Sequence, residues 1–164
     1  MRIVGKWARF QISMYGDLRD STTFPQAPTM DELKTTLTLL KQYGMKCLFD
    51  PIHEYGRIPN FETFYPLNAS AGAVMGDYKN FPPAALADVW VKLINWLEAN
   101  DLLDVIYAFD IMNEPHDLYA GSDSDPVELA KDFGYWIDYV QQVIAAIRAV
   151  NTTSPISVEG YHWA

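Results

Sequence analysis

The sequence alternates short apolar runs with longer segments whose apolar residues recur every three or four positions. The apolar runs lie at residues 7–14, 46–52, 105–112 and 155–159. Helical periodicity occupies residues 29–43, 83–100 and 125–150. Strands that alternate with helices of this length form a parallel sheet with right-handed crossovers. We therefore expect an α/β fold with about four parallel strands and helices on the outside.

The ends of the expected helices carry capping residues. Thr29 and Glu32 form a capping box, and Gly44 follows the last turn of the same helix. Asp125 precedes a proline that is favoured at the first helical position, and Glu128 completes a second box. The apolar residues at helical spacing are expected in the core: Leu33, Leu37, Leu40, Val89, Trp90, Leu93, Leu97, Phe133, Trp136, Ile137, Val140, Ile144 and Ile147.

The composition bounds the class of protein. The 164 residues are 49% hydrophobic and 14% aromatic, which predicts one globular domain over residues 1–164. The net charge of -9 repels phosphate backbones and disfavours a nucleic acid partner, but not a neutral sugar. No run approaches membrane-spanning length, and the first residues lack the apolar centre of a signal peptide. The single cysteine, Cys47, cannot form an internal disulfide and is predicted to be a small core residue.

Polar and aromatic residues cluster at the ends of the expected strands, where parallel α/β sheets bind their ligands. The candidates from the four strands are Arg9; His53, Glu54 and Tyr55; Asn113 and Glu114; and Glu159, His162 and Trp163. Because the carboxyl ends of parallel strands meet at one edge, these residues are expected to form a shared site. No His-Glu-x-x-His motif or glycine-rich phosphate loop occurs, so no metal or cofactor is expected.

The sequence around Glu114 favours acid chemistry. Pro115 restricts the preceding backbone to an extended conformation, which fixes the direction of the carboxyl group. A carboxyl group in an aromatic, partly dry cleft can protonate a leaving oxygen near neutral pH. Asn113 can hydrogen-bond a substrate hydroxyl, and Trp163 offers a flat apolar face to a sugar ring.

Structural roles for the same residues stay open. Glu114 could cap a strand end, and Asn113 could simply form a loop. His53 and Trp163 could be core residues. Arg9 could form a buried ion pair with Asp50 or Asp110, alone or together with a ligand contact.

Several motifs resemble those of glycoside hydrolase family 5, the cellulase-type family of clan A barrels. IMNEPHD, residues 111–117, is similar to the family's fourth-strand motif. FDPIHEYGR, residues 49–57, resembles the third-strand motif that ends in His-Asn-Tyr. VEGYHW, residues 158–163, resembles the fifth-strand Gly-x-x-Trp segment, and Arg9 matches the arginine of the second strand. The resemblance covers nearly the whole chain but only about half of a family barrel.

The resemblance implies a partial TIM (β/α) barrel and a retaining glycosidase similar to an endo-β-1,4-glucanase. Glu114 would be the general acid/base, and Asn113 would contact the sugar 2-hydroxyl. His53 and Arg9 would support the site, while Tyr55 and Trp163 would bind substrate. Mannan, xylan-type and β-1,3-linked polymers stay open as substrates. The resemblance also makes an extracellular location plausible, although this chain shows no signal peptide.

The second catalytic carboxylate is the main departure from the family. The family nucleophile is a glutamate on the seventh strand, whereas this chain stops after the equivalent of the fifth strand. Retaining chemistry requires two carboxyl groups roughly 5–5.5 Å apart. Glu159 is a candidate substitute, although it aligns with no catalytic position of the family.

Three hypotheses follow. The chain is a truncated barrel that cleaves β-glucan, or a carbohydrate-binding half-barrel without a complete catalytic pair. Alternatively, it is an assembly unit with two exposed sheet edges. These edges could pair in a homodimer, which would complete an eight-stranded ring, or another chain could supply the missing half.

Overall fold

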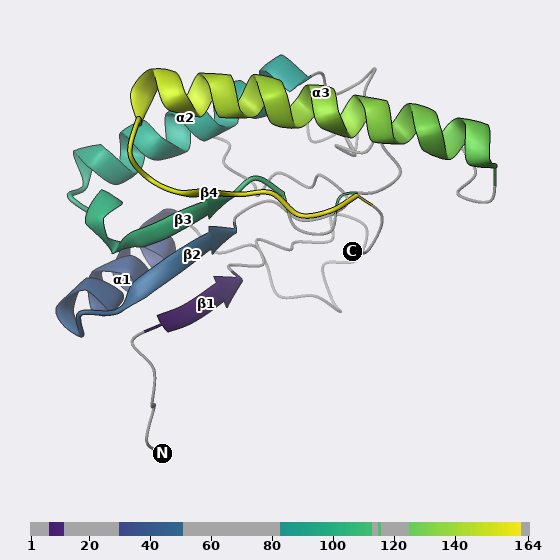
Figure 1. The fold of residues 1–164 in the computed structure, drawn as a ribbon. Coiled ribbons are helices and arrows are strands. Elements are labelled where there is room, and N and C mark those ends of the chain that lie inside the picture. Colours follow the sequence, from purple (N-terminus) through teal and green to yellow (C-terminus); the bar gives the residue numbers. More distant parts are fainter. Residues whose placement is uncertain (1–6, 12–29, 51–82, 113–114, 116–124, 162–164) are drawn as a thin grey trace, which may run out of the picture.

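The computed structural model describes residues 7–11, 30–50, 83–112, 115 and 125–161. The strands are β1 (Trp7–Gln11), β2 (Lys46–Asp50), β3 (Ile106–Asp110) and β4 (Ile156–Ser157). The helices are α1 (Met30–Gln42), α2 (Pro83–Ala99) and α3 (Pro126–Val150), with the short 3-10 helix η2 (Leu103–Val105) before β3. All strand pairs are parallel, in the order β1-β2-β3-β4, which confirms the predicted α/β class (Figure 1).

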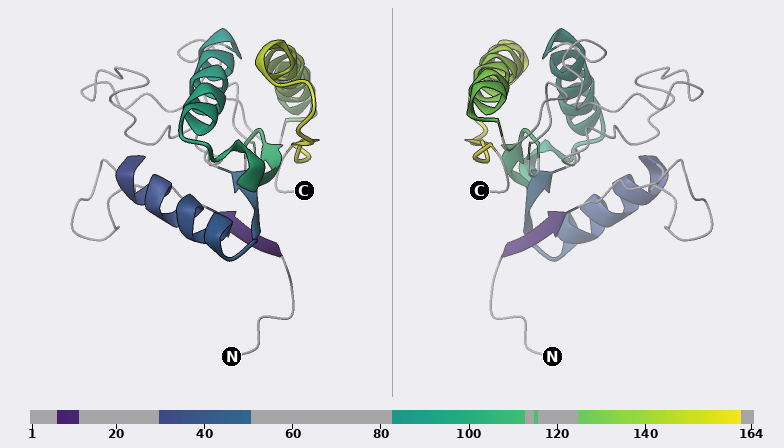
Figure 2. Two further views of the ribbon diagram at one scale, coloured as in Figure 1. Left: turned by 90° about the vertical axis from the view of Figure 1, so that its left-hand side faces the viewer. Right: turned by 90° about the vertical axis from the view of Figure 1, so that its right-hand side faces the viewer.

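The helices are arranged around one side of the sheet, with α2 and α3 side by side (Figure 2). This arrangement follows from the topology, because right-handed crossovers between consecutive neighbouring strands place every helix on the same face. Within the described residues, no helix combines the length and apolar character needed to cross a membrane.

Two strands are shorter than the sequence predicts. β3 begins at Ile106 because residues 103–105 form η2, and it ends at Asp110. β4 is limited to Ile156–Ser157, although residues 155–159 are expected as a strand. The segment after β4 bonds to α3 through the Glu159 carbonyl, so it does not extend the ladder. Residues 12–14 and 51–52 and the predicted cap at Thr29 lie outside the described residues.

The core lies between the sheet and its helices. Trp90 on α2 is fully buried and makes edge contacts with Phe49 at 6.2 Å and Phe109 at 5.6 Å between ring centroids. Register pairing places Phe49 beside Phe109. The expected core of α1 and α2 is confirmed, since the following residues are all buried: Leu33, Leu37, Leu40, Val89, Trp90, Leu93 and Leu97. Cys47 in β2 is also buried, as predicted.

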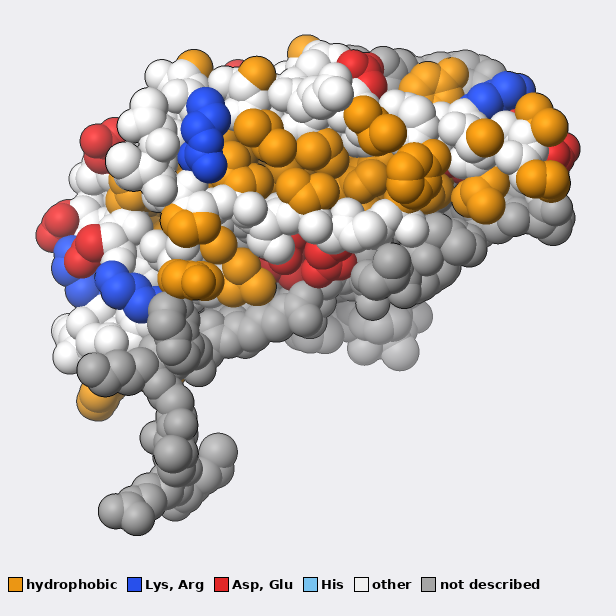
Figure 3. All heavy atoms as spheres, in the orientation of Figure 1, with side chains coloured by type: hydrophobic (Ala, Val, Ile, Leu, Met, Phe, Trp, Pro, Cys, Tyr) orange, Lys and Arg blue, Asp and Glu red, His pale blue; other side chains and the backbone are white. Residues whose placement is uncertain are grey.

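Helix α3 differs from its prediction. Trp136 and Ile147 are buried as expected, but Phe133 is 52% exposed and Ile137 is 45% exposed. We call Phe133, Ile137, Val140 and Ile144 the apolar stripe; the space-filling view shows apolar side chains running along α3 on this side (Figure 3). Helical spacing shows which apolar residues share one face of a helix. It does not show how much of that face a neighbouring element covers.

The two ends of α3 are fixed by side chains. The carboxylate of Asp125 accepts a hydrogen bond from the Val127 amide at 2.8 Å, which confirms the predicted N-cap. The carboxylate of Glu128 pairs with Lys131 at 2.7 Å. At the other end, Arg148 donates to the carbonyls of Asn151 and Ser154 and so shapes the turn into β4.

Helices α1 and α2 end in the same backbone motif. Gly44 and Asp101 adopt left-handed conformations, with φ of 64° and 57°. After α1, the paired amide-to-carbonyl bonds are Met45 to Leu40 and Gly44 to Lys41. After α2, they are Leu102 to Leu97 and Asp101 to Glu98. This is the Schellman arrangement, which satisfies the last carbonyls of a helix.

An ion-pair cluster joins these two helix ends. The ammonium of Lys41 lies 2.9 Å from the carboxylate of Asp101 and 3.0 Å from that of Asp104. Hydrogen bonding to Asp101, then to Asp104, raises the pKa of Lys41 above its ordinary value. The cluster lies where the chain enters β2 and β3, at the amino ends of these strands.

Candidate active site

The carboxyl ends of the four strands form one row. Gln11 pairs in register with Asp50, and Asp110 pairs with Ser157. Phe49 pairs with Phe109, which places Asp50 and Asp110 in neighbouring positions. The carboxyl ends of these parallel strands therefore lie at one edge of the sheet. Arg9 lies within β1, and the other candidate residues follow β2, β3 and β4 in the sequence.

The structure describes only some of the predicted site residues. Arg9 lies in β1, where its backbone pairs in register with Leu48. Glu159 is half-buried after β4, and Pro115 is buried. The other candidate residues lie outside the described residues, and their roles stay predictions: His53, Glu54, Tyr55, Asn113, Glu114, His162 and Trp163.

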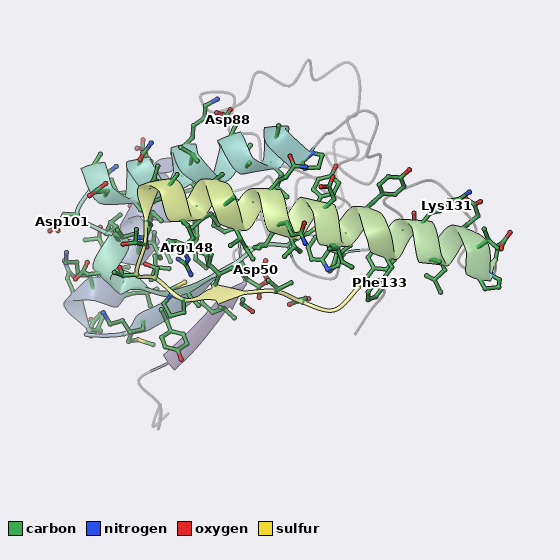
Figure 4. The ribbon with its side chains drawn as sticks, turned by 45° about the horizontal axis from the view of Figure 1, so that its top comes forward. Asp50, Asp88, Asp101, Lys131, Phe133 and Arg148 are labelled. Carbon is green, nitrogen blue, oxygen red and sulfur yellow. The ribbon has the colours of Figure 1, made fainter. Side chains whose placement is uncertain are left out.

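Two buried carboxyl groups stand at the site edge. Asp50 is 2% exposed and Asp110 is 1% exposed, and both have interaction partners (Figure 4 labels Asp50). Side chains alternate along a strand, so both point to the face opposite to Phe49 and Phe109. Sequence reasoning considered them only as partners of Arg9. The sequence did contain a signal for a polar site here: each of the two apolar strands ends in a single aspartate, and a buried charge requires a compensating partner.

The chain leaving β3 is held on both sides. The indole of Trp90 donates to the carbonyl of Ile111 at 3.2 Å, and the Ile111 amide donates to the Ser157 carbonyl at 3.2 Å. Ile111 and Met112 are fully buried. The sequence continues directly into Asn113 and Glu114, so the predicted acid follows a firmly anchored segment.

The chain leaving β4 is held by α3. The indole of Trp136 donates to the Glu159 carbonyl at 3.1 Å, and the Tyr161 hydroxyl donates to Asp132 at 2.9 Å. The ring of Phe133 contacts that of Tyr161 edge-on at 6.2 Å. The last two residues of the motif at this strand, His162 and Trp163, follow directly in the sequence.

The chain segments after β3 and after β4 are therefore held in the same way: in each, a tryptophan indole of a covering helix donates a hydrogen bond to a backbone carbonyl. Trp90 serves the exit of β3, and Trp136 serves the exit of β4. Fixed strand exits suit chemistry that depends on the exact placement of an acid. Among the described residues, no three His, Cys, Asp or Glu side chains are grouped as metal ligands.

Comparisons with known proteins identify relatives of this architecture. The family model described as cellulase, glycosyl hydrolase family 5, matches residues 6–164. The endoglucanase Cel5A of Pseudomonas stutzeri is 29% identical, with a TM-score of 0.55, over 85% of this chain and 34% of that chain. The same enzyme in complex with cellobiose gives 30% identity and a TM-score of 0.55, over 84% of this chain and 33% of that chain.

A more distant neighbour shares the fold. A broad-specificity GH5-4 endoglucanase from Bacteroides salanitronis is 20% identical, with a TM-score of 0.53, over 84% of this chain and 36% of that chain. The search of curated proteins gave no match.

The present chain spans about a third of the length of these endoglucanases. Its four parallel strands and outer helices form part of a (β/α) barrel, as the motifs predict. Since the family model covers nearly all of the sequence, the chain belongs to the cellulase family, glycosyl hydrolase family 5.

Proposed function

We propose that this chain carries the acid/base part of a retaining β-glucan hydrolase site. The observation that carries the proposal is the position of Glu114, four residues after the end of β3 in a parallel sheet whose four carboxyl ends form one row. Membership of the cellulase family supports the reaction class.

In this proposal Glu114 protonates the glycosidic oxygen as the bond to the leaving sugar breaks. Asn113 binds the sugar 2-hydroxyl, and Arg9 and His53 support the site from β1 and from the segment after β2. Tyr55 and Trp163 contact the sugar rings. The anchoring of Ile111 by Trp90 and Ser157 supports this assignment, because a proton donor must be held against the leaving oxygen.

The proposed substrate is a β-1,4-linked glucan. The solved structure of the Pseudomonas stutzeri endoglucanase contains cellobiose, which supports this substrate class for a chain 30% identical to it. The acidic net charge is compatible with a neutral polysaccharide. Mannan, xylan-type and β-1,3-linked polymers are the alternatives for a comparative assay.

The nucleophile is the incomplete part of the proposal. Glu159 is a candidate because it follows β4 at the same edge, with its backbone carbonyl fixed by Trp136. If Glu159 fails as a nucleophile and no other carboxylate is supplied, the chain acts as a carbohydrate-binding half-barrel.

The test compares hydrolysis of a soluble β-glucan by the wild-type chain, Glu114→Gln and Glu159→Gln. The control is Glu98→Gln, on the exposed end of α2. Loss of general acid catalysis lowers the rate by about 100-fold or more, so Glu114→Gln is expected to be nearly inactive and the control unchanged. Equal activity of wild type and Glu114→Gln would overturn the assignment. Calorimetric binding without product would favour the binding module, and no binding would exclude it.

One surface favours an additional role in assembly. β1 and β4 are the edges of the described sheet, and open edges invite pairing. Exposed apolar side chains occur on α3, where Phe133 and Ile137 are 52% and 45% exposed, and just after β4, where Val158 is 44% exposed. We propose that a second copy of the chain pairs its β1 with this edge and completes the ring as a homodimer.

Sedimentation velocity tests the homodimer. Ile137→Lys places a charge in the apolar stripe and is expected to shift a dimer toward monomer. Asn95→Lys, on the exposed side of α2, is the control and should leave the dimer intact. A wild-type chain that sediments as a folded monomer at all concentrations would refute this assembly.

A further inference from the structure

The connection between α3 and β4 contains the sequence Asn151-Thr152-Thr153, which has the acceptor pattern for N-glycosylation, Asn-x-Ser/Thr. We propose that Asn151 is instead a turn-locking residue that sets the entry into β4. This role closes the acceptor pattern to glycan attachment for as long as the turn is folded. Neither property depends on the proposed hydrolase activity.

The side chain of Asn151 closes the turn by accepting two backbone hydrogen bonds. Its Oδ1 accepts from the Thr153 amide at 3.1 Å and from the Ser154 amide at 2.8 Å. Asparagine favours such bonds, because its short side chain reaches the backbone amides two and three residues further on. The backbone amide of Asn151 donates to the Ile147 carbonyl at 2.7 Å, so the same residue also ends α3.

Arg148 holds the same turn from the last turn of α3. Its guanidinium nitrogen Nη1 donates to the carbonyl of Asn151 at 3.2 Å and to that of Ser154 at 2.8 Å. The Arg148 side chain therefore lies between the end of α3 and the chain that leads to β4 (Figure 4). We call the contacts of Asn151 and Arg148 the turn lock, because together they fix the segment 151–154 at both of its ends.

The turn lock matters for β4 because this strand is short. β4 comprises only Ile156 and Ser157, and within the described sheet it pairs with β3 alone. The Phe109 amide donates to the Pro155 carbonyl at 3.0 Å, and the Ile111 amide donates to the Ser157 carbonyl at 3.2 Å. A strand with so few ladder bonds depends for its register on the chain that enters it. Pro155 directly follows the locked segment, so a loosened turn would release the first of these bonds.

Attachment of a glycan requires the Asn151 side chain to leave this turn. In N-glycosylation the asparagine Nδ2 bonds to the anomeric carbon of a lipid-linked sugar, the pyrophosphate of the donor leaves, and the nitrogen loses a proton. The transferase must surround the side-chain amide to do this, whereas Asn151 is only 6% exposed. The two bonds to its Oδ1 also hold the amide group in place. The folded turn and the transferase therefore compete for the same side chain.

Thermal unfolding of the full chain tests the turn lock. Asn151→Ala removes the acceptor of two hydrogen bonds, and we expect the melting temperature to fall by about 5 °C. Asn151→Asp keeps an acceptor oxygen and should stay within about 2 °C of wild type. Thr153→Ala is the matched control: it destroys the acceptor pattern but keeps the backbone amide that the turn uses, so the melting temperature should not change. Equal melting temperatures for Asn151→Ala and wild type would overturn the turn lock. If Asn151→Ala fails to fold, Arg148→Met tests the other half of the turn lock by the same criterion.

Expression of the full chain behind a secretion leader in a glycosylating eukaryotic host tests the closure of the pattern. Peptide mass spectrometry of the folded, secreted protein measures glycan occupancy, and we expect residue 151 to be unoccupied in wild type. Lys34→Asn places an asparagine before Thr35 and Thr36, which presents the same Asn-Thr-Thr sequence at an exposed position of α1, and it should be occupied.

Arg148→Met adds a second arm to the glycosylation experiment. It loosens the turn but leaves residues 151–153 unchanged, so occupancy at residue 151 should rise above that of wild type. Occupancy at residue 151 of the wild-type protein similar to that of the Lys34→Asn site would overturn the closure. Equal occupancy in Arg148→Met and wild type would also overturn it, because the turn would then give no protection.

Discussion

The indole N–H of Trp90 donates a hydrogen bond of 3.2 Å to the carbonyl of Ile111, three residues before Glu114. The same indole ring packs edge-on against Phe49 and Phe109, which are register partners in β2 and β3. One side chain of α2 therefore links the centre of the core to the chain segment that leads into the predicted acid. Core packing and the geometry of the candidate site are coupled at this residue.

Replacing Trp90 by phenylalanine should reveal this coupling. Trp90→Phe keeps an aromatic ring in the core but leaves the buried Ile111 carbonyl without its donor, which costs about 1–3 kcal/mol in unfolding free energy. Urea unfolding measures the loss. Trp96→Phe, a half-buried position on the same helix, is the control and should cost less. Equal costs at the two positions would show that the hydrogen bond to Ile111 contributes nothing.

Two glycines with open surroundings should respond to alanine in opposite directions. An added methyl group meets no atom within 4 Å at Gly44 or at Gly134. Gly44 has a φ of 64°, so Gly44→Ala is expected to cost about 1 kcal/mol through backbone strain alone. Gly134 lies inside α3, where alanine is favoured over glycine by about 0.8–1.0 kcal/mol. In thermal unfolding, the melting temperature of Gly134→Ala should be higher than that of wild type, and that of Gly44→Ala should be lower. Melting temperatures that change in the same direction would contradict this prediction.

The ion pairs of Lys41 predict a stability change in alkaline solution. Hydrogen bonds to Asp101 and Asp104 raise the pKa of Lys41 in the folded protein above its ordinary 10.5. A raised folded-state pKa favours folding at pH values below 10.5, and this contribution is lost as the pH rises through the folded-state pKa. Lys41→Met should therefore be less stable than wild type at pH 8, and the difference should shrink above pH 10.5. Salt should reduce the difference at pH 8, because the pairs are exposed. A gap that is independent of pH would exclude the ion pairs as its cause.

The sequence predicts local features of this fold more completely than long-range ones. The stripe of Leu33, Leu37 and Leu40 and the cap at Asp125 depend on neighbours within a few residues, and both are confirmed. The left-handed turn at Asp101 is not predicted, because an aspartate there lacks the glycine signal that marks Gly44. The exposure of Phe133 is also missed, because helical spacing carries no information about the neighbours of a helix.

The candidate site shows the same limit. Parallel topology is enough to predict that the strand ends meet at one edge. The bond between Tyr161 and Asp132, however, joins residues 29 positions apart and follows no periodic pattern. Trp136 similarly reads as an ordinary core residue until its contact with Glu159 is seen. Positioning contacts of this kind depend on how α3 is placed beside the end of β4, and only the three-dimensional arrangement supplies that information.

The buried carboxyl groups of Asp50 and Asp110 lead to a last prediction, which concerns Arg9. Its backbone pairs with Leu48, two residues before Asp50, and Asp110 is the neighbour of Asp50 in the next strand. If Arg9 is their ion-pair partner, Arg9→Met leaves a buried charge uncompensated and should cost about 3–5 kcal/mol in unfolding free energy. Arg148→Met, which removes hydrogen bonds to two backbone carbonyls, is the control and should cost less.

A double-mutant cycle assigns the partner of Arg9. When two residues interact, the cost of the double variant differs from the sum of the single costs by about 0.5–3 kcal/mol. Arg9→Met combined with Asp50→Asn or with Asp110→Asn should cost less than that sum in at least one case, because neutralising the carboxylate removes the charge that Arg9 compensates. Additive costs in both cycles would place Arg9 outside this ion pair and leave ligand contact as its predicted role.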